Sequence, residues 1–442
     1  MGVLGCVLAF SLVIFLNYID VPMFISAVVA SMVAILFNGM PLVGTMVETF
    51  FPKCGYYFGF FMGLYIFGAI LGQLYSISGA GSTVALTIMN WLSNDKTSAK
   101  KKDLLALIIT IVAGFILSYG GVQCVVLVFT LYPIGLVLFE KCDIPRKYLV
   151  GTIIGGTTAF AMTAPGSPQP PNVAAMALFN TSSFQGWIPG IIGCVVEFVV
   201  MLMILYHMIE KAKKRGEHFT YGEKDVPYQD DRPRPSFLVS ILPLIVTYAL
   251  FNIVKLNVIF AVAVGVVLAV LLFRPYFEDK SVIGIFKQVG VGANAGTQSM
   301  GLVAFAYGFG ATMQFTPGFQ SIVNFFCGLD ISPVILLVVA VAILAAMTGG
   351  SGSSQQLAVP MILPTLEAKG LTGAFIHRIS CFAGSTLDTL PSSGAVLTGV
   401  RLSGIPMKEA YPACFVCCVM ATTIGTIVVA AVSSLFPILT VI

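Results

Sequence analysis

Apolar runs alternate with short polar connections along the whole chain. An α-helix needs about 20 predominantly apolar residues to cross the ~30 Å hydrocarbon core of a bilayer. Runs that we interpret as ordinary spans cover residues 3–16, 21–37, 57–92, 187–207, 237–253, 257–273, 297–327 and 410–436. We expect the long run at 57–92 to be tilted or broken near Gly79. The pattern predicts a polytopic, all-α membrane protein with about ten full spans and no sizeable soluble domain.

Two further runs are too long for one span and too short for two spans joined by a loop. Residues 104–139 are interrupted by glycine and polar residues at 118–123, and residues 333–366 are interrupted in the same way at 348–356. Irregular backbone is tolerated at membrane depth only where protein or a water-filled cavity surrounds it. We therefore predict two re-entrant hairpins.

Each predicted hairpin is followed by an interrupted helix. The helix at 149–179 is broken by a proline-rich stretch at 163–172, and the helix at 375–402 is broken at 388–394. Proline removes a backbone donor and ends helical continuity, so these are discontinuous helices. The sequence of hairpin and broken helix thus occurs twice.

Matching positions indicate an internal repeat. Thr, Pro and Ser at the first, third and fifth positions of 163–167 recur at 389–393, which is 226 residues later (389 − 163). Three further pairs keep the same order: Gly120-Gly121 with Gly349-Gly350, Glu140 with Glu367, and Phe67-Gly68-Ala69 with Phe309-Gly310-Ala311. We predict a first repeat at 1–207, a linker at 208–236 and a second repeat at 237–442.

The positive charges predict the topology, because Lys and Arg accumulate on the cytoplasmic side of membrane proteins. Basic residues cluster at 96–102, 146–147 and 207–235, and all three segments are therefore expected inside. Counting spans from them places both termini outside, and the two hairpins enter from opposite sides. The two repeats then have inverted topology, and their four breaks are expected to meet near the membrane midplane.

The composition excludes a soluble globular protein. Hydrophobic residues make up 57% of the chain and charged residues 10%, and the mean hydropathy is +0.96. The net charge of +4 lies in short loops, so it indicates orientation in a bilayer and no nucleic-acid partner. The only close cysteine group, Cys414, Cys417 and Cys418, lies in an apolar run, where we expect packing residues. No metal and no cofactor are expected.

Four breaks that converge in a membrane are typical of a substrate site in transporters built from inverted repeats. Half-helix N-termini there bind anionic groups, and unwound carbonyls can hold a cation. Flexible kinks satisfied by neighbouring helices are the alternative interpretation. The candidate substrate-binding residues are Ser118, Gly120, Gly121, Thr163, Ser167, Gln169, Asn172, Gly349, Gly350, Ser351, Ser353, Ser354, Thr389, Ser392 and Ser393.

Asp388 and Glu197 are the candidates for ion coupling. An ionisable side chain inside a span is costly, so a carboxyl beside a break is a candidate carrier of a coupled proton. Asp388 could instead cap the half-helix that follows the break, and Glu197 could have a structural partner on a neighbouring helix. The adjacent His377 and Arg378 are expected to anchor a helix end at the membrane interface, or else to attract anions.

Several motifs in residues 348–411 resemble the gluconate permease family, and most closely its branch of 3-hydroxybutyrate permeases. They are Ser351-Gly352-Ser353, His377-Arg378-Ile379, Leu387-Asp388-Thr389-Leu390-Pro391, Gly394-Ala395-Val396 and Lys408-Glu409-Ala410-Tyr411. The family belongs to the wider ion transporter superfamily. The resemblance implies proton-coupled uptake of a monocarboxylate or hydroxy acid, such as 3-hydroxybutyrate or gluconate, across a bacterial inner membrane. Ser392-Ser393 stands where that branch is expected to have His-Asn. The identity of the substrate therefore depends on whether these two side chains contact it.

We therefore interpret the chain as a symporter that binds a small organic anion together with a proton or a sodium ion. A sodium/proton or carboxylate antiporter of the same fold is the alternative, and a homodimer stays open as the assembly. An intramembrane serine hydrolase using Ser351 or Ser353 with His377 is a remote third hypothesis, because such an enzyme needs the base within hydrogen-bond reach of the nucleophile. We expect no catalytic residues.

Overall fold

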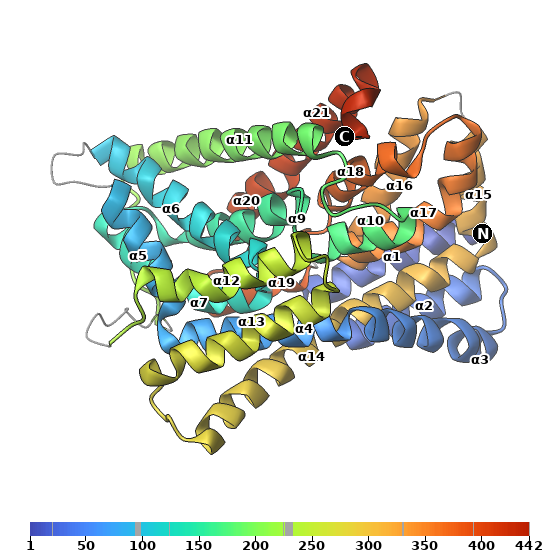
Figure 1. Cartoon of the computed structure of the whole chain (residues 1–442). Helices are drawn as coiled ribbons and strands as arrows, with labels where there is room; N and C mark the ends of the chain where they lie inside the picture. The colour runs from blue at the N-terminus through green and yellow to red at the C-terminus, as the bar shows by residue number, and fades with distance from the viewer. Residues whose placement is uncertain are drawn as a thin grey trace.

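The chain folds into helices that run mostly along one direction between two opposite ends of the molecule (Figure 1). The computed structural model describes residues 1–19, 21–92, 99–122, 124–223, 225, 233–328, 331–391 and 393–441. Within these ranges the regular structure is helical and contains no β-strand. The prediction of an all-α polytopic membrane fold is confirmed.

The helices occur in the same order in the two halves of the chain. The first half contains α1 (Gly2–Tyr18), α2 (Met23–Phe37), α3 (Leu42–Thr45), α4 (Phe51–Ser78), α5 (Ala80–Leu92), α6 (Ala99–Tyr119), α7 (Cys124–Lys141), α8 (Leu149–Ile154), α9 (Ala161–Thr163), α10 (Pro170–Phe179) and α11 (Trp187–Lys214). The second half contains α12 (Phe237–Asn252), α13 (Val258–Phe273), α14 (Val282–Phe315), α15 (Pro317–Gly328), α16 (Pro333–Thr348), α17 (Ser351–Ala368), α18 (Gly373–Gly384), α19 (Gly394–Ser403), α20 (Met407–Cys414) and α21 (Ala421–Leu435).

Both predicted hairpins are present. Helices α6 and α7 turn at a tip that includes Gly120 and Gly121, and α16 and α17 turn at Gly349 and Gly350. Gly121 and Gly349 have positive φ angles of 103° and 60°, which glycine adopts without a steric cost. The two hairpins open toward opposite ends of the molecule (Figure 1).

The two broken helices run antiparallel to each other. The first consists of α8, a π-helical turn at 155–160, α9 and α10, and the second consists of α18 and α19. Gly373 at the start of α18 packs on Phe179 at the end of α10, and Gly399 near the end of α19 packs on Val150 at the start of α8. This crossing is the geometry that inverted repeats require.

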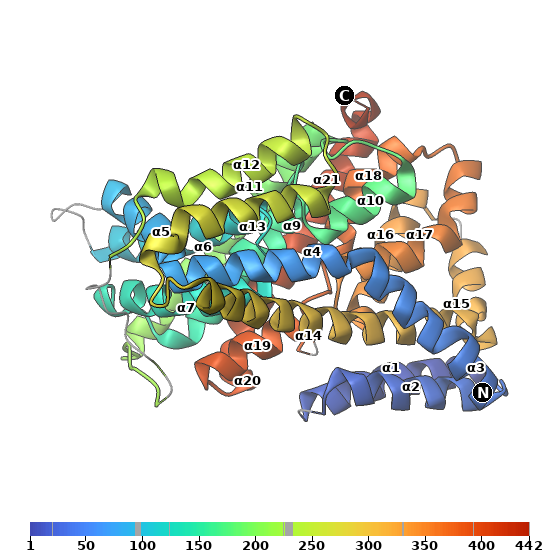
Figure 2. The ribbon, with the colours of Figure 1, turned by 60° about the horizontal axis from the view of Figure 1, so that its bottom comes forward.

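The long helices α4 and α14 form the most extensive helix pair of the fold and lie side by side in Figure 2. Glycines make the close approach between them: a Cβ added to Gly292 or Gly296 would lie 2.7 Å from backbone atoms of α4. Small residues at such contacts let helix backbones pack closely in membrane proteins, where dispersion forces drive association. These two helices carry the paired Phe-Gly-Ala motifs.

Several span predictions differ from the structure in length. Among the described residues, five helices are long and apolar enough to cross a bilayer, and four apolar helices are shorter. The predicted spans 3–16 and 21–37 form helices of 17 and 15 residues, below the ~20 residues that a full crossing takes. The run at 57–92 is broken at Gly79 as expected, whereas Pro317 breaks the run at 297–327 at a point that we did not predict.

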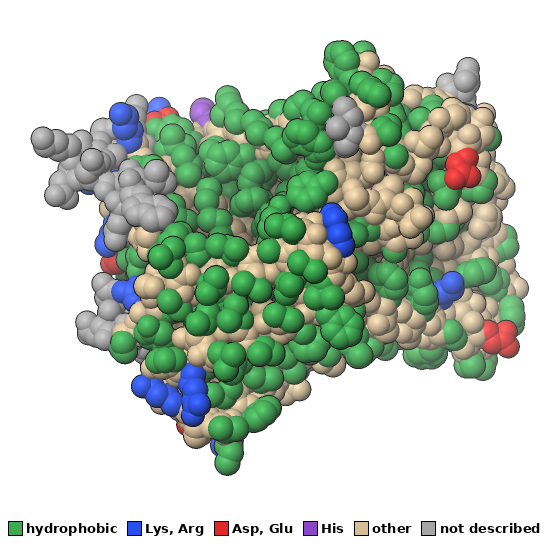
Figure 3. Space-filling view, in the orientation of Figure 1, with side chains coloured by type: hydrophobic (Ala, Val, Ile, Leu, Met, Phe, Trp, Pro, Cys, Tyr) green, Lys and Arg blue, Asp and Glu red, His purple; other side chains and the backbone are tan. Residues whose placement is uncertain are grey.

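The predicted linker begins later than residue 208, because α11 continues to Lys214. The end of α11 and the chain after it pack along the open end of the first hairpin. Lys213 Nζ bonds both carboxylate oxygens of Asp103 at 2.8 Å, and Arg146 Nη1 pairs with Asp225 Oδ2 at 2.7 Å. Lys and Arg side chains gather mainly at one end of the visible face, while hydrophobic side chains cover its middle (Figure 3).

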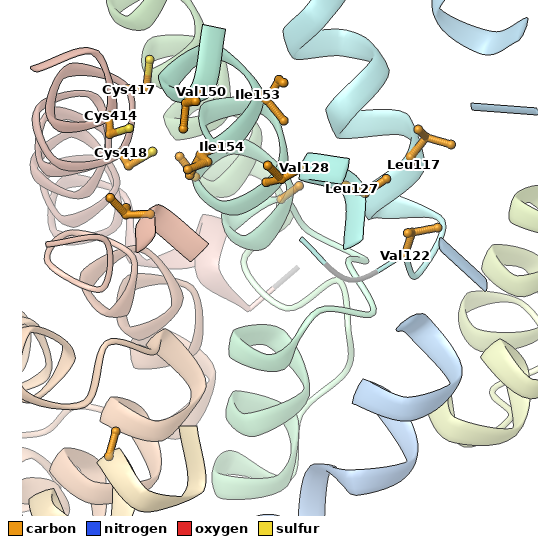
Figure 4. Close-up of a cluster of buried hydrophobic side chains, with 14 of the residues drawn as sticks. Leu117, Val122, Leu127, Val128, Val150, Ile153, Ile154, Cys414, Cys417 and Cys418 are labelled. Atoms are coloured by element: carbon orange, nitrogen blue, oxygen red, sulfur yellow. The ribbon is translucent and has the colours of Figure 1, made fainter. Parts of the chain in front are cut away.

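Buried apolar side chains form one continuous cluster, and buried polar side chains such as Glu197 and Arg378 lie among them. Cys414, Cys417 and Cys418 are fully buried, and Figure 4 shows Cys414 and Cys418 beside Val150 and Ile154 of the first broken helix. These three cysteines are free, so they act as the small packing residues that the sequence predicts.

Candidate functional site

The second hairpin and the second broken helix enclose a cavity of about 170 Å³. A cavity needs roughly 10–15 Å³ of such volume to hold one water molecule, so this one has room for about ten waters or a small organic molecule. Its lining from the second half includes the tip residues Thr348 to Gly352 and, around the break, Asp388, Thr389, Ser393 and Gly394. Residues of α1, α2 and their connection, of α4, α7 and α14, and of the first broken helix contribute the other walls.

The tip of the second hairpin brings backbone close to the cavity. Gly349 ends α16 in the left-handed conformation, and α17 begins two residues later at Ser351. Gly384, the last residue of α18, lies against Ser351, where an added Cβ would be 3.0 Å from the Ser351 carbonyl oxygen. Glycine at this contact allows the hairpin tip and the second break to lie next to each other.

Asp388 is buried in the wall of the cavity, with 6% of its surface exposed. Ser351 at the start of α17 and the neighbouring Thr389 line the same cavity. Asp388 does not cap the following half-helix, because the N-cap position of α19 is occupied by Ser393. Asp388 therefore belongs to the cavity wall beside the hairpin tip.

The neighbouring Thr389 has an unsatisfied hydroxyl group. Its side chain is 2% exposed and lines the cavity, and its Oγ1 atom has no hydrogen-bond partner among the described residues. A buried polar group without a partner costs about 1–3 kcal/mol. A bound molecule or water in the cavity would remove that cost.

At the first break, side chains of the protein itself form hydrogen bonds with the irregular backbone. Gln169 Nε2 donates hydrogen bonds to the carbonyl oxygens of Ser118 and Val122 at 2.6 and 3.2 Å, which ties the first break to the first hairpin tip. The Ser118 hydroxyl in turn donates to the Thr157 carbonyl oxygen at 3.0 Å. At this tip Gly120 packs on Leu244 of α12. These residues hold irregular backbone in place.

His377 and Arg378 are fully buried and contact the first broken helix. The His377 ring nitrogens lie 2.6 Å from Thr181 Oγ1 and 3.0 Å from Asn172 Oδ1. The Arg378 guanidinium donates to the carbonyl oxygens of Thr163, Ser183 and Gln185 at 3.1–3.2 Å. The expectation that the pair anchors a helix end at the membrane interface is wrong, because both side chains lie inside the protein.

Glu197 lies in α11 behind the first break. It is fully buried, its Oε2 atom accepts a hydrogen bond from Thr163 Oγ1 at 2.8 Å, and its Oε1 atom has no partner among the described residues. Gly425 of α21 packs directly on its side chain. Glu197 does not line the cavity that contains Asp388.

The predicted site residues thus lie in different parts of the structure, and only some of them line the cavity. Those that line the cavity are Gly349, Gly350, Ser351, Asp388, Thr389 and Ser393. Ser353 and Ser354 bond the hairpin tip, where their hydroxyl groups donate to the carbonyl oxygens of Gly350 and Ser351. Away from the cavity lining lie the first-half residues Ser118, Gly120, Gly121, Thr163, Ser167, Gln169 and Asn172. Ser392 lies outside the described residues.

Some residues that line the cavity belong to none of the motifs identified in the sequence. Tyr57 and Tyr65 of α4 and Arg401 of α19 line the cavity, as do the polar residues Asn17, Cys124, Thr158 and Thr398. A polar side chain inside an apolar run, such as Asn17, was the available signal. Among the described residues, no group of three or more His, Cys, Asp or Glu side chains could hold a metal ion.

The geometry does not place a serine nucleophile beside a histidine base. The His377 nitrogens bond Thr181 and Asn172, whereas the Ser353 hydroxyl bonds Thr348 Oγ1 at 2.8 Å and Ser351 Oγ lies 3.7 Å from Met162 Sδ. A hydrolase would need the base within hydrogen-bond reach of the nucleophile. The described residues therefore give the hydrolase hypothesis no support.

Comparisons with known proteins agree with the fold. A model of the GntP family of permeases matches residues 1–435. The uncharacterized transporter YxjC of Bacillus subtilis is 24% identical over 455 residues, which covers 91% of this chain and 93% of YxjC. An uncharacterized transporter of Haemophilus influenzae is 27% identical over 179 residues, covering 40% of this chain and 38% of that protein.

A solved structure has a similar arrangement of helices. The YdaH transporter of Alcanivorax borkumensis, described as having an unusual topology, superposes with a TM-score of 0.52 at 11% sequence identity. The match covers 87% of this chain and 88% of that structure. At this identity the likeness shows the fold alone.

Proposed function

The chain belongs to the GntP family of permeases, and from that premise we propose that this membrane transporter takes up a small organic anion by cation-coupled symport. The proposed substrates are monocarboxylates or hydroxy acids such as 3-hydroxybutyrate or gluconate. The observation that carries the proposal is the cavity at the second hairpin tip, with the buried Asp388 carboxyl in its wall. A proton is the favoured coupling ion, and sodium is the alternative.

The position of Asp388 supports coupling on electrostatic grounds. Two negative charges about 5 Å apart repel by about 3 kcal/mol at an effective dielectric constant near 20. An anion in the cavity is therefore disfavoured while Asp388 is ionised and uncompensated. Protonation of Asp388, or a sodium ion beside it, removes that repulsion, so the cation has to accompany the anion.

The polar groups of the cavity support an anionic substrate of modest size. Ser351 begins α17, and Ser393 and Gly394 begin α19, so the first turns of two helices lie at the cavity. Helix N-termini present free N–H groups and the positive end of the helix dipole. Arg401 adds a positive side chain to the lining, while Asp388 is the only carboxyl among the described lining residues.

The test is uptake of radiolabelled 3-hydroxybutyrate and gluconate into proteoliposomes under an imposed proton or sodium gradient. We expect one inward gradient to drive accumulation above equilibrium. Accumulation that neither gradient stimulates would overturn symport. Stimulation by the same carboxylate trapped inside the vesicles, with no response to either gradient, would indicate the antiporter instead.

A bacterial inner membrane is the proposed location. The named relatives are bacterial, and the basic end of the molecule matches the cytoplasmic side expected from the distribution of Lys and Arg. This orientation places both chain termini outside, and it is tested by the labelling experiment in the Discussion.

A further inference from the structure

We propose that the turn between α1 and α2 is part of the substrate site, and that Asn17 in this turn accepts a hydrogen bond from a hydroxyl group of the substrate. The proposal rests on the proposed function and deepens it, because it assigns the hydroxyl of a hydroxy acid to one side chain. The turn belongs to neither hairpin and to neither broken helix, so it adds a separate element to the site.

The helices α1 and α2 form a pair that packs against α15 and α14 (Figure 2). At the end of the pair away from the turn, Asn38 Nδ2 donates to the Gly2 carbonyl oxygen at 3.3 Å, and Asn38 Oδ1 accepts from the Gly318 N–H at 2.7 Å. Nearer the turn, the Phe24 ring packs edge-on against the Phe305 ring of α14, with 5.0 Å between the ring centroids. These contacts fix the position of the turn.

The turn reaches the cavity itself. Four of its residues, Asn17, Val21, Pro22 and Met23, line the cavity together with the second hairpin tip and the second break. A helix of 17 residues such as α1 extends about 25 Å, and in Figure 2 the pair ends partway along α14. Asn17 is 2% exposed. A polar amide is therefore placed deep inside the protein at the cavity wall.

The backbone of the turn does not need the Asn17 side chain. The Ser26 hydroxyl lies 3.2 and 3.0 Å from the carbonyl oxygens of Val21 and Pro22, which satisfies the turn from within α2. Both hydrogen bonds that Asn17 makes to described residues use Nδ2, one of them to the Val13 carbonyl oxygen at 2.8 Å. Oδ1 is left as the acceptor that Asn17 presents to the cavity.

Asn252 occupies the equivalent place in the other half of the chain. The helices α12 and α13 precede α14 as α1 and α2 precede α4, and α4 and α14 carry the paired Phe-Gly-Ala motifs. Asn17 and Asn252 both lie at the end of the first helix of their pair. The Nδ2 atom of each donates to the carbonyl oxygen four residues earlier, that of Val13 or Tyr248. The two side chains therefore start from the same local geometry.

Asn252 uses its remaining groups at the first break. Its Nδ2 also donates to the Gly166 carbonyl oxygen at 3.0 Å, and its Oδ1 accepts from the Ser183 hydroxyl at 2.8 Å. An asparagine at this place thus binds polar groups of a break. Asn17 borders the open cavity of the second break instead, so a bound ligand can supply the donor that Ser183 supplies to Asn252.

A neutral hydroxyl donor suits Asn17 better than a cation or the substrate carboxylate. An amide oxygen accepts hydrogen bonds and cannot pair with another acceptor such as a carboxylate. Hard cations take several oxygen ligands, whereas Val21, Pro22 and Met23 beside Asn17 have no side-chain oxygen. A site that bonds a substrate hydroxyl discriminates against the analogue without it, because the buried acceptor is then left unpaired.

The test measures the preference of the purified full chain for a hydroxyl group, as the ratio of the dissociation constants of butyrate and 3-hydroxybutyrate. We expect the wild type to bind 3-hydroxybutyrate about 3-fold to 10-fold more tightly, the value of one hydrogen bond. Asn17→Leu should bind both acids with similar affinity, because it has no acceptor for the hydroxyl. A folded Asn17→Leu protein that keeps the wild-type ratio would overturn the inference.

Asn252→Leu is the matched control. It removes the same side chain at the equivalent place, but the lost hydrogen bonds are to the protein itself. We expect a lower thermal unfolding temperature and an unchanged butyrate to 3-hydroxybutyrate ratio, whereas Asn17→Leu should unfold near the wild-type temperature. If Asn17→Leu unfolds at as low a temperature as Asn252→Leu, or does not fold, Asn17 is a structural residue and the inference is overturned.

The unfolding temperatures are measured without ligand, so they separate a failure of the inference from a failure of the proposed function. Wild-type protein that binds neither acid contradicts the proposed substrates, and the stability of Asn17→Leu then decides whether Asn17 is available to a ligand. An Asn252→Leu protein that does not fold supports the structural role of Asn252, and Asn17→Leu is then compared with the wild type alone.

Discussion

At the scale of single residues, Asp388 is the carboxyl whose position bears most directly on coupling. In the proposed symport its charge would oppose an anion in the cavity, so we expect binding to need the neutral form of Asp388 or a bound cation. We expect Asp388→Asn to abolish gradient-driven accumulation of substrate, because the amide cannot release a proton. Exchange of internal for external substrate should persist.

The measurement is accumulation and counterflow of 3-hydroxybutyrate in the same proteoliposome preparation. Glu367→Gln is the control, since Glu367 is an exposed carboxylate that does not line the cavity. Unchanged pH-driven accumulation in Asp388→Asn would remove Asp388 from the coupling mechanism.

Thr389 and Thr163 allow a matched comparison between the two breaks. Thr389→Val removes a hydroxyl that has no partner in the described structure, so we expect unchanged or slightly higher thermal stability. Substrate affinity should fall roughly 3-fold to 10-fold, the value of one hydrogen bond of about 0.5–1.5 kcal/mol.

Thr163→Val should behave in the opposite way. It removes the hydrogen bond to Glu197 and should cost about 1–3 kcal/mol of stability, with little direct effect on binding. Thermal unfolding and equilibrium binding of both variants test the pair. Equal loss of stability in the two variants would contradict the asymmetry between the breaks.

The sequence located polar residues beside the breaks, but it did not show which of them line the cavity and which bond backbone. Asp388 and the glycines of the second tip were singled out and line the cavity. Gln169 and Asn172 were singled out for the same reasons and instead bond neighbouring backbone. A polar residue beside a break can serve substrate or backbone, and the choice depends on contacts with helices far away in the chain, which composition does not reveal.

At the scale of helices, packing around the first break is tight. A Cβ added to Gly156, in the π-helical turn before α9, would lie 2.4 Å from the Ile111 carbonyl oxygen of α6. Backbone cannot move aside as a side chain can, so we expect Gly156→Ala to destabilise the protein by about 1–3 kcal/mol. Thermal unfolding in detergent measures the effect.

Gly59→Ala in α4 is the control for this substitution. Apart from the adjacent residues and the backbone of its own helix, no described heavy atom lies within 4 Å of a Cβ built there, and alanine has the higher helix propensity. We expect this variant to be neutral or slightly more stable. A Gly156→Ala variant as stable as Gly59→Ala would mean that the first hairpin and the first broken helix are less closely packed than described.

The positions of the hairpins and of the broken helices could be predicted well from the sequence. The lengths of the helices could be predicted less well. Hydropathy located both hairpins and both broken helices because glycine and proline interrupt apolar runs visibly. The helices α1 and α2, predicted as full spans, have 17 and 15 residues and belong to the shorter apolar helices. Hydropathy also missed the break at Pro317, because a single proline inside a long apolar run is often accommodated by a kink.

At the scale of the whole molecule, the orientation in the membrane can be tested by cysteine labelling. Ser236 and Lys369 are exposed and lie near the predicted inner and outer surfaces. We expect Lys369→Cys to react with a membrane-impermeant maleimide in intact cells, and Ser236→Cys to react only after the inner membrane is opened. A background in which Cys142 and Cys327 are serine limits labelling of native thiols. The reverse pattern would contradict the proposed topology.

Inversion of the two halves was predicted from charge placement and paired motifs, and the antiparallel broken helices match it. What the sequence could not show is that the halves are unequal. That inequality arises from contacts such as Arg378 with Thr163, which join residues 215 positions apart.

The Arg378 contact also has a consequence for cutting the chain. A fragment that ends before Arg378 leaves the carbonyl oxygens of Thr163, Ser183 and Gln185 without this donor. We therefore expect residues 1–207 and residues 237–442, produced as separate polypeptides, to be stable only when they are expressed together.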